Sequence, residues 1–454
     1  MDCQSFLEQL LIKSRIAQEQ FENFSQEEVD NVVREIGKVV YDNAERLARM
    51  AVDETGMGVY EDKTVKNKGK AKTIWNDLKD KKSVGIIHRD EITGIVKIAK
   101  PMGIVASITP TTNPIVTPMS NAMFALKGRN SIIISPHPRS KKCSSYTVEL
   151  INEAIKKFDV PENLIQVIKE PSIELTNKLM QLADVVVATG GSGMVKAAYS
   201  SGKPAFGVGP GNVQCIIDRD VEFRDAVVKI IRGRTFDNGI ICSGEQSVII
   251  HEDDYDLIIE EFRNNNCYFI QDSKEKESIR KVLFPNGTMN KDVVGQSAHR
   301  IGKMAGLPIS ENTKALLVEA DGIGDKDLLC KEKMCPLLTI FKYRTFEEAI
   351  EIAQANLELE GKGHTAAIHS TDADHIEYAG KNLTVSRLVV NQPSSTTAGG
   401  SFFNGFAPTT TLGCGSWGNN SISENFTYKH MINITCIGYF MKNKTVPSDE
   451  EIWA

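Results

Sequence analysis

The sequence predicts an α/β protein whose first domain is a doubly wound parallel sheet. Three observations lead to this fold. The chain has 454 residues, enough for two or three domains. From residue 103 onward, short apolar runs alternate with helical stretches, as in repeated β–α units with a buried sheet. A glycine-rich turn at residues 189–193 follows one apolar run and opens a helical stretch.

Composition and charge narrow the class of protein. The chain is 41% hydrophobic and 25% charged, with a formal net charge of −6, which is typical of a soluble globular protein. It has no basic stripe, which disfavours a nucleic-acid partner, and no apolar run long enough to span a bilayer. Its start lacks the features of a signal peptide, and nine scattered cysteines indicate reduced thiols. We therefore expect a cytoplasmic protein that does not enter a membrane.

The first 55 residues predict two amphipathic helices. Apolar residues recur at helical spacing, and Ser25 followed by Glu28 forms a capping box at the start of the second helix. Residues 57–82 are rich in lysine. We expect them to form a surface helix with loops, whose charge serves solubility.

Buried strands and crossover helices are expected next. The strands correspond to residues 104–108, 132–134, 164–168, 185–188 and 205–208, and crossover helices to residues 115–126 and 144–158.

After residue 218 a second α/β pattern follows. A helix at 223–234 precedes a turn with glycine and cysteine at 238–245, and a strand at 246–250 comes next. Residues 394–423 are rich in Gly, Ser, Thr and Asn, a composition suited to lining a cleft. Further strands are expected at 315–319, 337–343 and 365–369, and a helix at 345–357.

Two turns are candidates for chemistry. At 189–193, glycines that follow a strand let the backbone approach a phosphate, although Val195 occupies the last position of a strict G-x-G-x-x-G pattern. This turn is either a cofactor site or a plain strand–helix turn. At Cys242, a Gly/Ser turn predicts a thiolate facing backbone N–H groups, which would lower its pKa and hold an oxyanion. The alternative is a small buried hydrophobic residue.

A metal site and a serine hydrolase site are both disfavoured. Cys330 and Cys335 have no second pair at ligand spacing, and His364 and His369 are five residues apart. No G-x-S-x-G sequence occurs. We therefore expect no metal.

Several short motifs occur in a fixed order along the chain. They are the turns at Cys242 and 189–193 and residues 207–212 (GVGPGN), 332–336 (EKMCP), 110–114 (PTTNP), 135–138 (SPHP) and 411–418 (TLGCGSWG). Taken together, these motifs resemble the aldehyde dehydrogenase superfamily, and the last three resemble its CoA-acylating branch. The resemblance covers nearly the whole chain and is strongest to succinate-semialdehyde dehydrogenases.

The resemblance implies an aldehyde dehydrogenase-like α/β fold with a small β arm for oligomerisation. It places a Rossmann-like NAD(P)-binding domain at 1–217, with the arm segment 83–100 inside it. A catalytic domain with the nucleophilic cysteine follows at 218–410. Residues 411–454 then line the cleft and supply the C-terminal oligomerisation strand. We expect at least a homodimer, because an exposed strand is stable when it pairs with another subunit.

The resemblance also makes Cys242 the nucleophile, which forms an enzyme thioester. The oxyanion is stabilised by the Cys242 backbone N–H and by a side chain at Thr112 or Asn113, of which Asn113 is our choice. Asn113 could also serve only as a turn former before proline. Hydrolytic members carry a glutamate where this chain has Gly207. Without that general base, typically worth about 10²–10⁴-fold, water should react slowly and the thiol of CoA should accept the acyl group.

Cofactor contacts follow from the same resemblance. Glu332 matches the glutamate that binds the nicotinamide ribose. The usual Lys-Pro-x-Glu run at the adenosine ribose is replaced here by residues 135–138, so no glutamate repels a 2′-phosphate, and Arg139 adds charge nearby. We expect NADP, with NAD as the alternative. The cofactor-binding set is Thr189, Gly190, Gly191, Ser192, Glu332, Pro136 and Arg139.

The predicted reaction reduces succinyl-CoA to succinate semialdehyde and CoA with NADPH, reversibly. His364 is a candidate base or acid for the CoA thiol, or else a hydrogen-bonded residue at a strand start. Ser243, Ser395 and Thr396 are expected around the acyl chain. The alternatives are acetaldehyde, sulfoacetaldehyde or another short aldehyde with NADH, and, in a different class, a non-catalytic homologue or an encapsulated cargo protein.

Overall fold

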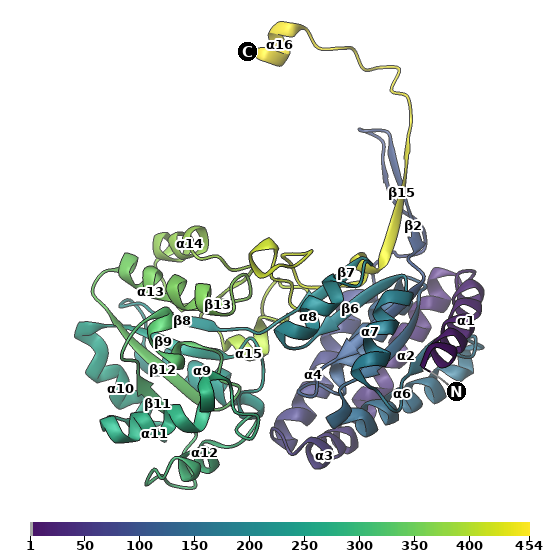
Figure 1. Cartoon of the computed structure of the whole chain (residues 1–454). Helices are drawn as coiled ribbons and strands as arrows, with labels where there is room; N and C mark the ends of the chain where they lie inside the picture. Colours follow the sequence, from purple (N-terminus) through teal and green to yellow (C-terminus); the bar gives the residue numbers. More distant parts are fainter. Residues whose placement is uncertain (1–2) are drawn as a thin grey trace.

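Two parallel β-sheets, one in each half of the chain, organise the protein (Figure 1). The structure is a computed structural model and describes residues 3–454. A five-stranded sheet and a seven-stranded sheet form the two large units, and a three-stranded antiparallel sheet forms an arm. The predicted α/β fold is confirmed.

The five-stranded sheet has the order β5-β4-β3-β6-β7, with every pair parallel. The chain moves outward from β3 through β4 to β5 and then returns to the other side of β3, so the strand order reverses between β3 and β6. Ligands of doubly wound sheets bind beyond the strand ends at this reversal point. The strands are β3 (Ile104–Thr109), β4 (Ser131–Pro136), β5 (Ile165–Val167), β6 (Val185–Thr189) and β7 (Ala205–Val208).

Helices cover both faces of this sheet because its strands are apolar on both sides. Val105 packs in a core with α2, α4, α5 and α6, whereas its neighbours Ile104 and Ala106 pack in a separate core with α1, α7 and α8. The period of two along the strand thus separates the two helical layers. The helices are α1 (Cys3–Phe21), α2 (Gln26–Asp42), α3 (Ala44–Thr55), α4 (Tyr60–Leu78), α5 (Val116–Lys127), α6 (Lys141–Ile155), α7 (Ile173–Leu182) and α8 (Ser192–Tyr199).

The predicted N-terminal helices need one correction. The first 55 residues form three helices, not two, because the chain breaks at Asn43, which lies between α2 and α3 with φ −101° and ψ 15°. The capping box is confirmed: the Ser25 side chain accepts from the Glu28 backbone, and Glu28 accepts from the Ser25 backbone.

The seven-stranded sheet has the order β10-β11-β12-β9-β8-β13-β14 and is also parallel throughout. Its strands are β8 (Val213–Ile217), β9 (Glu245–His251), β10 (Cys267–Ile270), β11 (Ala315–Glu319), β12 (Leu337–Tyr343), β13 (Ala366–His369) and β14 (Leu388–Val390). Its helices are α9 (Phe223–Thr235), α10 (Tyr255–Asn264), α11 (Ser273–Leu283), α12 (Ala298–Met304), α13 (Phe346–Leu359) and α14 (Ala373–Asn382), with the short α15 (Ser394–Thr397) after them.

The expected boundary at residue 217 also needs a correction. β8 ends at Ile217, yet it pairs with β9 and β13 in the second sheet. The change from one sheet to the other therefore falls between β7 and β8.

The arm consists of a hairpin and a C-terminal strand that project from the first unit (Figure 1). β1 (Gly85–Asp90) and β2 (Ile95–Pro101) form the hairpin, and β15 (Ile432–Gly438) pairs antiparallel with β2. Beyond β15 the chain extends away from the body to the short helix α16 (Asp449–Trp453) (Figure 1). Within residues 3–454, no helix is both long and apolar enough to cross a membrane.

Candidate active site

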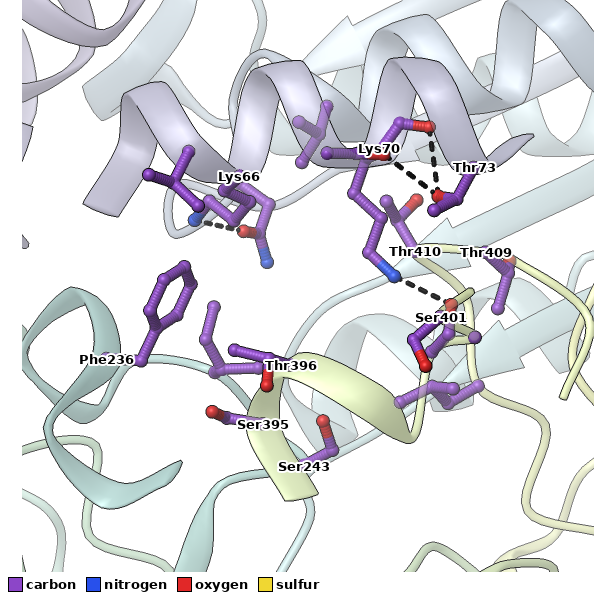
Figure 2. Close-up of a pocket in the computed structure, with 18 of the residues that line it drawn as sticks. Lys66, Lys70, Thr73, Phe236, Ser243, Ser395, Thr396, Ser401, Thr409 and Thr410 are labelled. Atoms are coloured by element: carbon purple, nitrogen blue, oxygen red, sulfur yellow. Dashed lines mark hydrogen bonds between the residues drawn. The ribbon is translucent and has the colours of Figure 1, made fainter. Parts of the chain in front are cut away.

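A cavity of about 310 Å³ lies between α4 and the turn that carries Cys242. Figure 2 shows Lys66, Lys70 and Thr73 on one wall, facing Ser243, Ser395 and Thr396 on the other. The volume is at the lower end of the range for small-molecule sites and suits a short acyl group. Besides these six residues, the lining includes Cys242, Asn113, Phe236, Ile241, Ser401, Phe402, Phe403, Thr409 and Thr410.

The turn before Cys242 is held in an unusual backbone conformation. Asp237, Asn238 and Gly239 all have positive φ values of 54°, 53° and 70°. The buried Arg234 at the end of α9 donates to the carbonyl of Gly239 and to that of Glu245, which lie on either side of Cys242. One guanidinium thus fixes both ends of the turn that carries Cys242.

The thiol of Cys242 is partly buried and faces the cavity. Burial, together with the nearby Glu332 and Cys414, raises its pKa to about 12. The expectation of a lowered pKa is therefore wrong for this structure. Burial disfavours the thiolate more than Arg387 and the local backbone dipole favour it.

Asn113 lies at the carboxyl end of β3 and lines the cavity, whereas Thr112 is absent from the lining. Its Oδ1 accepts a hydrogen bond of 2.8 Å from Lys66 Nζ. Within residues 3–454, neither Asn113 Nδ2 nor the Cys242 backbone N–H donates to another residue. Both groups are free to donate to an oxyanion, which favours Asn113 over Thr112 as the side-chain donor.

The lysines of α4 are not all at the surface, so the expectation that the charge of residues 57–82 serves solubility is wrong for part of this segment. Lys63 and Lys66 are almost completely buried, with side-chain exposures of 4% and 8%, and both pair with the fully buried Asp237. Sequence analysis missed their role. The available signal was their spacing, because Lys63, Lys66 and Lys70 fall on one helical face.

Lys70 is the other cation on this wall (Figure 2). Its Nζ donates one hydrogen bond, of 2.7 Å, to the Gly399 carbonyl. An ammonium has three donors, so two are left for a ligand. Burial lowers its pKa to about 8, so most of the amine is charged at neutral pH.

The three predicted substrate contacts come together on the opposite wall (Figure 2). Ser243, Ser395 and Thr396 line the same cavity as Cys242. The Ser395 hydroxyl is buried and has no hydrogen-bond partner within the described chain. It is available to a polar group on the acyl chain.

His364 and Glu332 both approach Gly211, and neither lines this cavity. A Cβ at Gly211 would lie 2.1 Å from the Cys242 carbonyl oxygen and 3.1 Å from His364 Nδ1, so only glycine allows these groups to approach. Gly211 N–H donates to Glu332 Oε1 at 3.1 Å. Burial, with Glu360 nearby, raises the pKa of Glu332 to about 8.

The imidazole of His364 is fully buried. Its Nδ1 contacts Thr365 Oγ1 at 3.0 Å, and its Nε2 has no partner within the described residues. Burial and the nearby Arg387 hold its pKa well below the usual value, so the ring is neutral. Nε2 is therefore available to a ligand, whereas burial disfavours the protonated ring.

Among residues 3–454, no Asp or Glu lines the cavity. Gly207 lies in β7 and packs against Tyr199 and Val195, with its N–H donating to the Tyr199 hydroxyl at 2.9 Å. Glu245, a carboxylate three residues after Cys242, is fully buried, and its Oε1 accepts from the Ser394 backbone. Neither position offers a base to a water molecule beside Cys242.

The glycine-rich turn follows β6 at the strand-order reversal, next to the end of β3. Gly191 precedes α8, and a Cβ at Gly191 or Gly193 would meet no atom within 4 Å. Thr189, Gly190 and the exposed Ser192 complete the turn. An open helix N-terminus at this position fits the phosphates of a dinucleotide.

Pro136 ends β4, two strands from the glycine-rich turn in the same sheet, and Arg139 follows in an exposed turn. Arg139 makes no ion pair with any residue of 3–454, whereas Lys141 is paired with Glu170. The free guanidinium fits a phosphate group at this edge.

Arg387, by contrast, is used inside the protein. Its guanidinium donates to the carbonyls of His364 and Gly413 at 2.6 and 2.7 Å and reaches Thr365 and Asn425. These bonds tie the residue before β14 to Gly413 and Asn425. No group of three His, Cys, Asp or Glu side chains suited to a metal forms within the described residues.

A cysteine turn beside one parallel sheet and a dinucleotide-type turn at the reversal point of another are the features expected of a nicotinamide-dependent dehydrogenase with a covalent cysteine intermediate. Comparisons with known proteins agree. The model of the aldehyde dehydrogenase family matches residues 6–274 and 318–431. The chain therefore belongs to the aldehyde dehydrogenase family.

Individual relatives place it in the CoA-acylating branch. It is 56% identical to succinate-semialdehyde dehydrogenase (acetylating) of Clostridium kluyveri over 98% of both chains. An acetylating aldehyde dehydrogenase of Geobacillus thermoglucosidasius superposes with a TM-score of 0.94, at 39% identity and 98% coverage of both chains. A propionaldehyde dehydrogenase of Rhodopseudomonas palustris, solved with bound CoA and an acylated cysteine, gives a TM-score of 0.85 at 29% identity, covering 95% of this chain and 97% of the other. The protein is thus a CoA-acylating oxidoreductase, as the sequence motifs predict.

Proposed function

We propose that this enzyme interconverts succinyl-CoA and succinate semialdehyde, with NADPH as the reductant, through a thioester on Cys242. The observation that carries the choice of substrate is Lys70, a cation with two free donors in a hydroxyl-lined cavity that has no carboxylate. A substrate with an anionic end matches this cavity better than acetaldehyde does.

In the reductive direction, the Cys242 sulfur attacks the carbonyl carbon of the acyl-CoA. The oxygen becomes an oxyanion, which the Cys242 N–H and Asn113 Nδ2 can stabilise. Collapse of this species breaks the bond to the CoA sulfur, and the proton from the Cys242 thiol ends on the departing thiol. The acyl group is then held as a thioester on Cys242.

The lack of a base in the cavity supports transfer to CoA over hydrolysis. Activating water by general-base catalysis is typically worth about 10²–10⁴-fold, and this chain has glycine at position 207. A thiol needs less help than water, because it ionises more readily.

His364 is proposed as the group that takes the proton from the thiol of CoA. Its unpartnered Nε2 and its position beside Gly211 support a role near the Cys242 backbone.

The residues at the strand-order reversal fit a dinucleotide. Thr189, Gly190, Gly191 and Ser192 would hold its phosphates, and Glu332 its nicotinamide ribose. Pro136 and Arg139 would lie at the adenosine end, where the unpaired Arg139 favours a 2′-phosphate and hence NADP over NAD. When bound, the nicotinamide supplies or accepts the hydride.

Lys70 gives the test of the substrate. Replacing it by methionine keeps the length of the side chain but removes the charge. The kcat/KM for succinyl-CoA is expected to fall about 10²-fold, because the loss of a charge-assisted contact costs about 1.5–3 kcal/mol. The value for acetyl-CoA should change little, since acetyl-CoA has no terminal carboxylate.

Wild-type enzyme is measured on succinyl-CoA, sulfoacetyl-CoA, acetyl-CoA and butyryl-CoA, each with NADPH and NADH. Lys68→Met is the matched control, because Lys68 lies on the same helix but pairs with Glu45 at the surface. A preference for sulfoacetyl-CoA would mean that the aldehyde substrate is sulfoacetaldehyde, the other anionic candidate, and not succinate semialdehyde. An equal loss of kcat/KM for acetyl-CoA in Lys70→Met would show that Lys70 does not bind the carboxylate of the substrate.

A homodimer or larger homo-oligomer is proposed from the arm. β15 lies at an edge of the three-stranded sheet, and every residue from Asn433 to Gly438 is exposed. An uncovered strand edge of this kind is stabilised by pairing with another copy. The eight cysteines from Cys143 to Cys436 are all free thiols, which is consistent with the proposed cytoplasmic location.

A further inference from the structure

A buried cluster of two lysines and one aspartate joins the two halves of the active site. Asp237 Oδ2 accepts from Lys63 Nζ at 3.0 Å and from Lys66 Nζ at 2.5 Å. Its Oδ1 accepts from the Val59 backbone at 2.9 Å. The carboxylate is thus saturated by donors from the N-terminal part of α4 and the residue before it.

The same cluster reaches the catalytic amide. Lys66 Nζ also donates to Asn113 Oδ1 at 2.8 Å. A lysine can only donate, so it can face only the oxygen of an amide and never the NH₂ group. Lys66 therefore selects one of the two orientations of the Asn113 side chain and turns Nδ2 away from itself.

The cluster also spans the two domains. Lys63 and Lys66 belong to α4, which packs with the first sheet, whereas Asp237 lies five residues before Cys242 in the second unit. The approach is close: a Cβ at Gly58 would lie 2.0 Å from Asp237 Oδ1. The ion pairs fix α4 against the base of the nucleophile turn.

From these contacts we infer that Lys66 is a positioning residue. It holds the Asn113 amide with Nδ2 toward the cavity, and through Asp237 it ties that amide to the turn that supplies the Cys242 N–H. The two oxyanion donors come from different domains, and Lys66 is the side chain that contacts both sides. The inference rests on the proposed roles of Cys242 and Asn113, but it is independent of which acyl group the enzyme accepts.

The loss of a single oxyanion donor typically lowers kcat about 10²–10³-fold. Without Lys66, the Asn113 amide can rotate and present its oxygen to the developing negative charge. Because Lys63 remains in place, Asp237 keeps one cationic partner in a Lys66→Met variant. That variant should therefore fold while losing the orientation of Asn113.

The experiment is a double-mutant cycle with Lys66→Met and Asn113→Ala. It uses the full-length enzyme and whichever CoA thioester wild-type turns over fastest. Each single variant is expected to lower kcat, by about 10²–10³-fold for Asn113→Ala and at least about tenfold for Lys66→Met, with KM nearly unchanged. In the Asn113→Ala background, adding Lys66→Met should cost less than about threefold, because the group it positions is already gone.

Lys66→Arg should recover most of the activity, since a guanidinium also only donates. A purely structural role would not give this pattern, because it would lower kcat equally with and without Asn113. Full additivity in the cycle, a folded Lys66→Arg as inactive as Lys66→Met, or an unchanged kcat in either single variant would each overturn the inference. The proposed function is judged separately by Cys242→Ala, which must abolish turnover.

Discussion

The Cys242 thiol lies where its ionised form is disfavoured. Burial and the neighbouring Glu332 raise its pKa to about 12. At neutral pH the free enzyme therefore holds a thiol, and the thiolate forms in quantity only when the surroundings change. A protonated cysteine is protected from oxidants and alkylating agents, because the thiolate is the reactive form.

This raised pKa predicts how alkylation depends on pH. Because the pKa lies above the working range, the thiolate fraction should rise about tenfold per pH unit from about pH 7 to pH 10. The rate of iodoacetamide labelling at Cys242 should follow it without levelling off. Mass spectrometry of the Cys242 peptide measures the rate, and the exposed Cys436 serves as an internal reference for the reagent.

A rate that levels off near pH 8 or below would contradict the raised pKa. It would mean that the backbone donors around the turn outweigh burial, as the residue pattern alone suggests.

At the scale of elements, α4 is the helix on which the site depends most. It supplies Lys63 and Lys66 to the cluster with Asp237 and Lys70 to the cavity. Burial disfavours the Asp237 carboxylate, but Lys66 and Lys63 outweigh burial and lower its pKa. The pairing is therefore strong enough to keep the buried carboxylate charged.

Replacing Asp237 by alanine is expected to lower the free energy of unfolding substantially. Asp237→Ala leaves two buried ammonium groups without a carboxylate partner, and breaking a buried ion pair from one side costs about 3–5 kcal/mol. Urea unfolding followed by circular dichroism measures the difference from wild type. Asp53→Ala, an exposed aspartate on the neighbouring helix α3, is the control and should change stability by less than about 0.5 kcal/mol. A loss for Asp237→Ala as small as that of the control would show that the cluster contributes nothing to stability.

The strands of the first sheet and the lysines of α4 differ in how far the sequence predicts them. The strands of the first sheet were predictable because Val, Ile and Ala runs between helical stretches are typical of buried parallel strands. Lys63 and Lys66 were not, because lysine in a polar helix is almost always solvated. Their burial depends on Asp237, a residue more than 170 positions away that becomes their neighbour only in the folded chain.

Part of the candidate site was also predictable from the sequence, and part was not. Cys242, Asn113, Ser243, Ser395 and Thr396 could be named from motifs, and the structure brings them to one cavity. The thiol pKa could not be predicted, because a Gly/Ser turn reveals the nearby N–H groups but not the degree of burial. The boundary at residue 217 failed for a related reason: β8 is as apolar as the strands before it, and only pairing shows which sheet it joins.

At the scale of the whole molecule, residues of both units line one cavity, and the proposed reaction uses groups from each. The first domain supplies Asn113 and the lysines of α4, and the second supplies the Cys242 turn with its serine and threonine wall. The arm projects outward from the first unit (Figure 1), and none of its residues lines the cavity. The proposed preference for CoA over water rests on this cavity, in which no Asp or Glu of residues 3–454 is present to activate water.

The most direct measurement of the central claim is mass spectrometry of the enzyme mixed with succinyl-CoA in the absence of NADPH. The account predicts one succinyl group on the Cys242 peptide, an adduct that persists in water, disappears when CoA is added and is absent from Cys242→Ala. No adduct, or an adduct on another cysteine, would contradict the account.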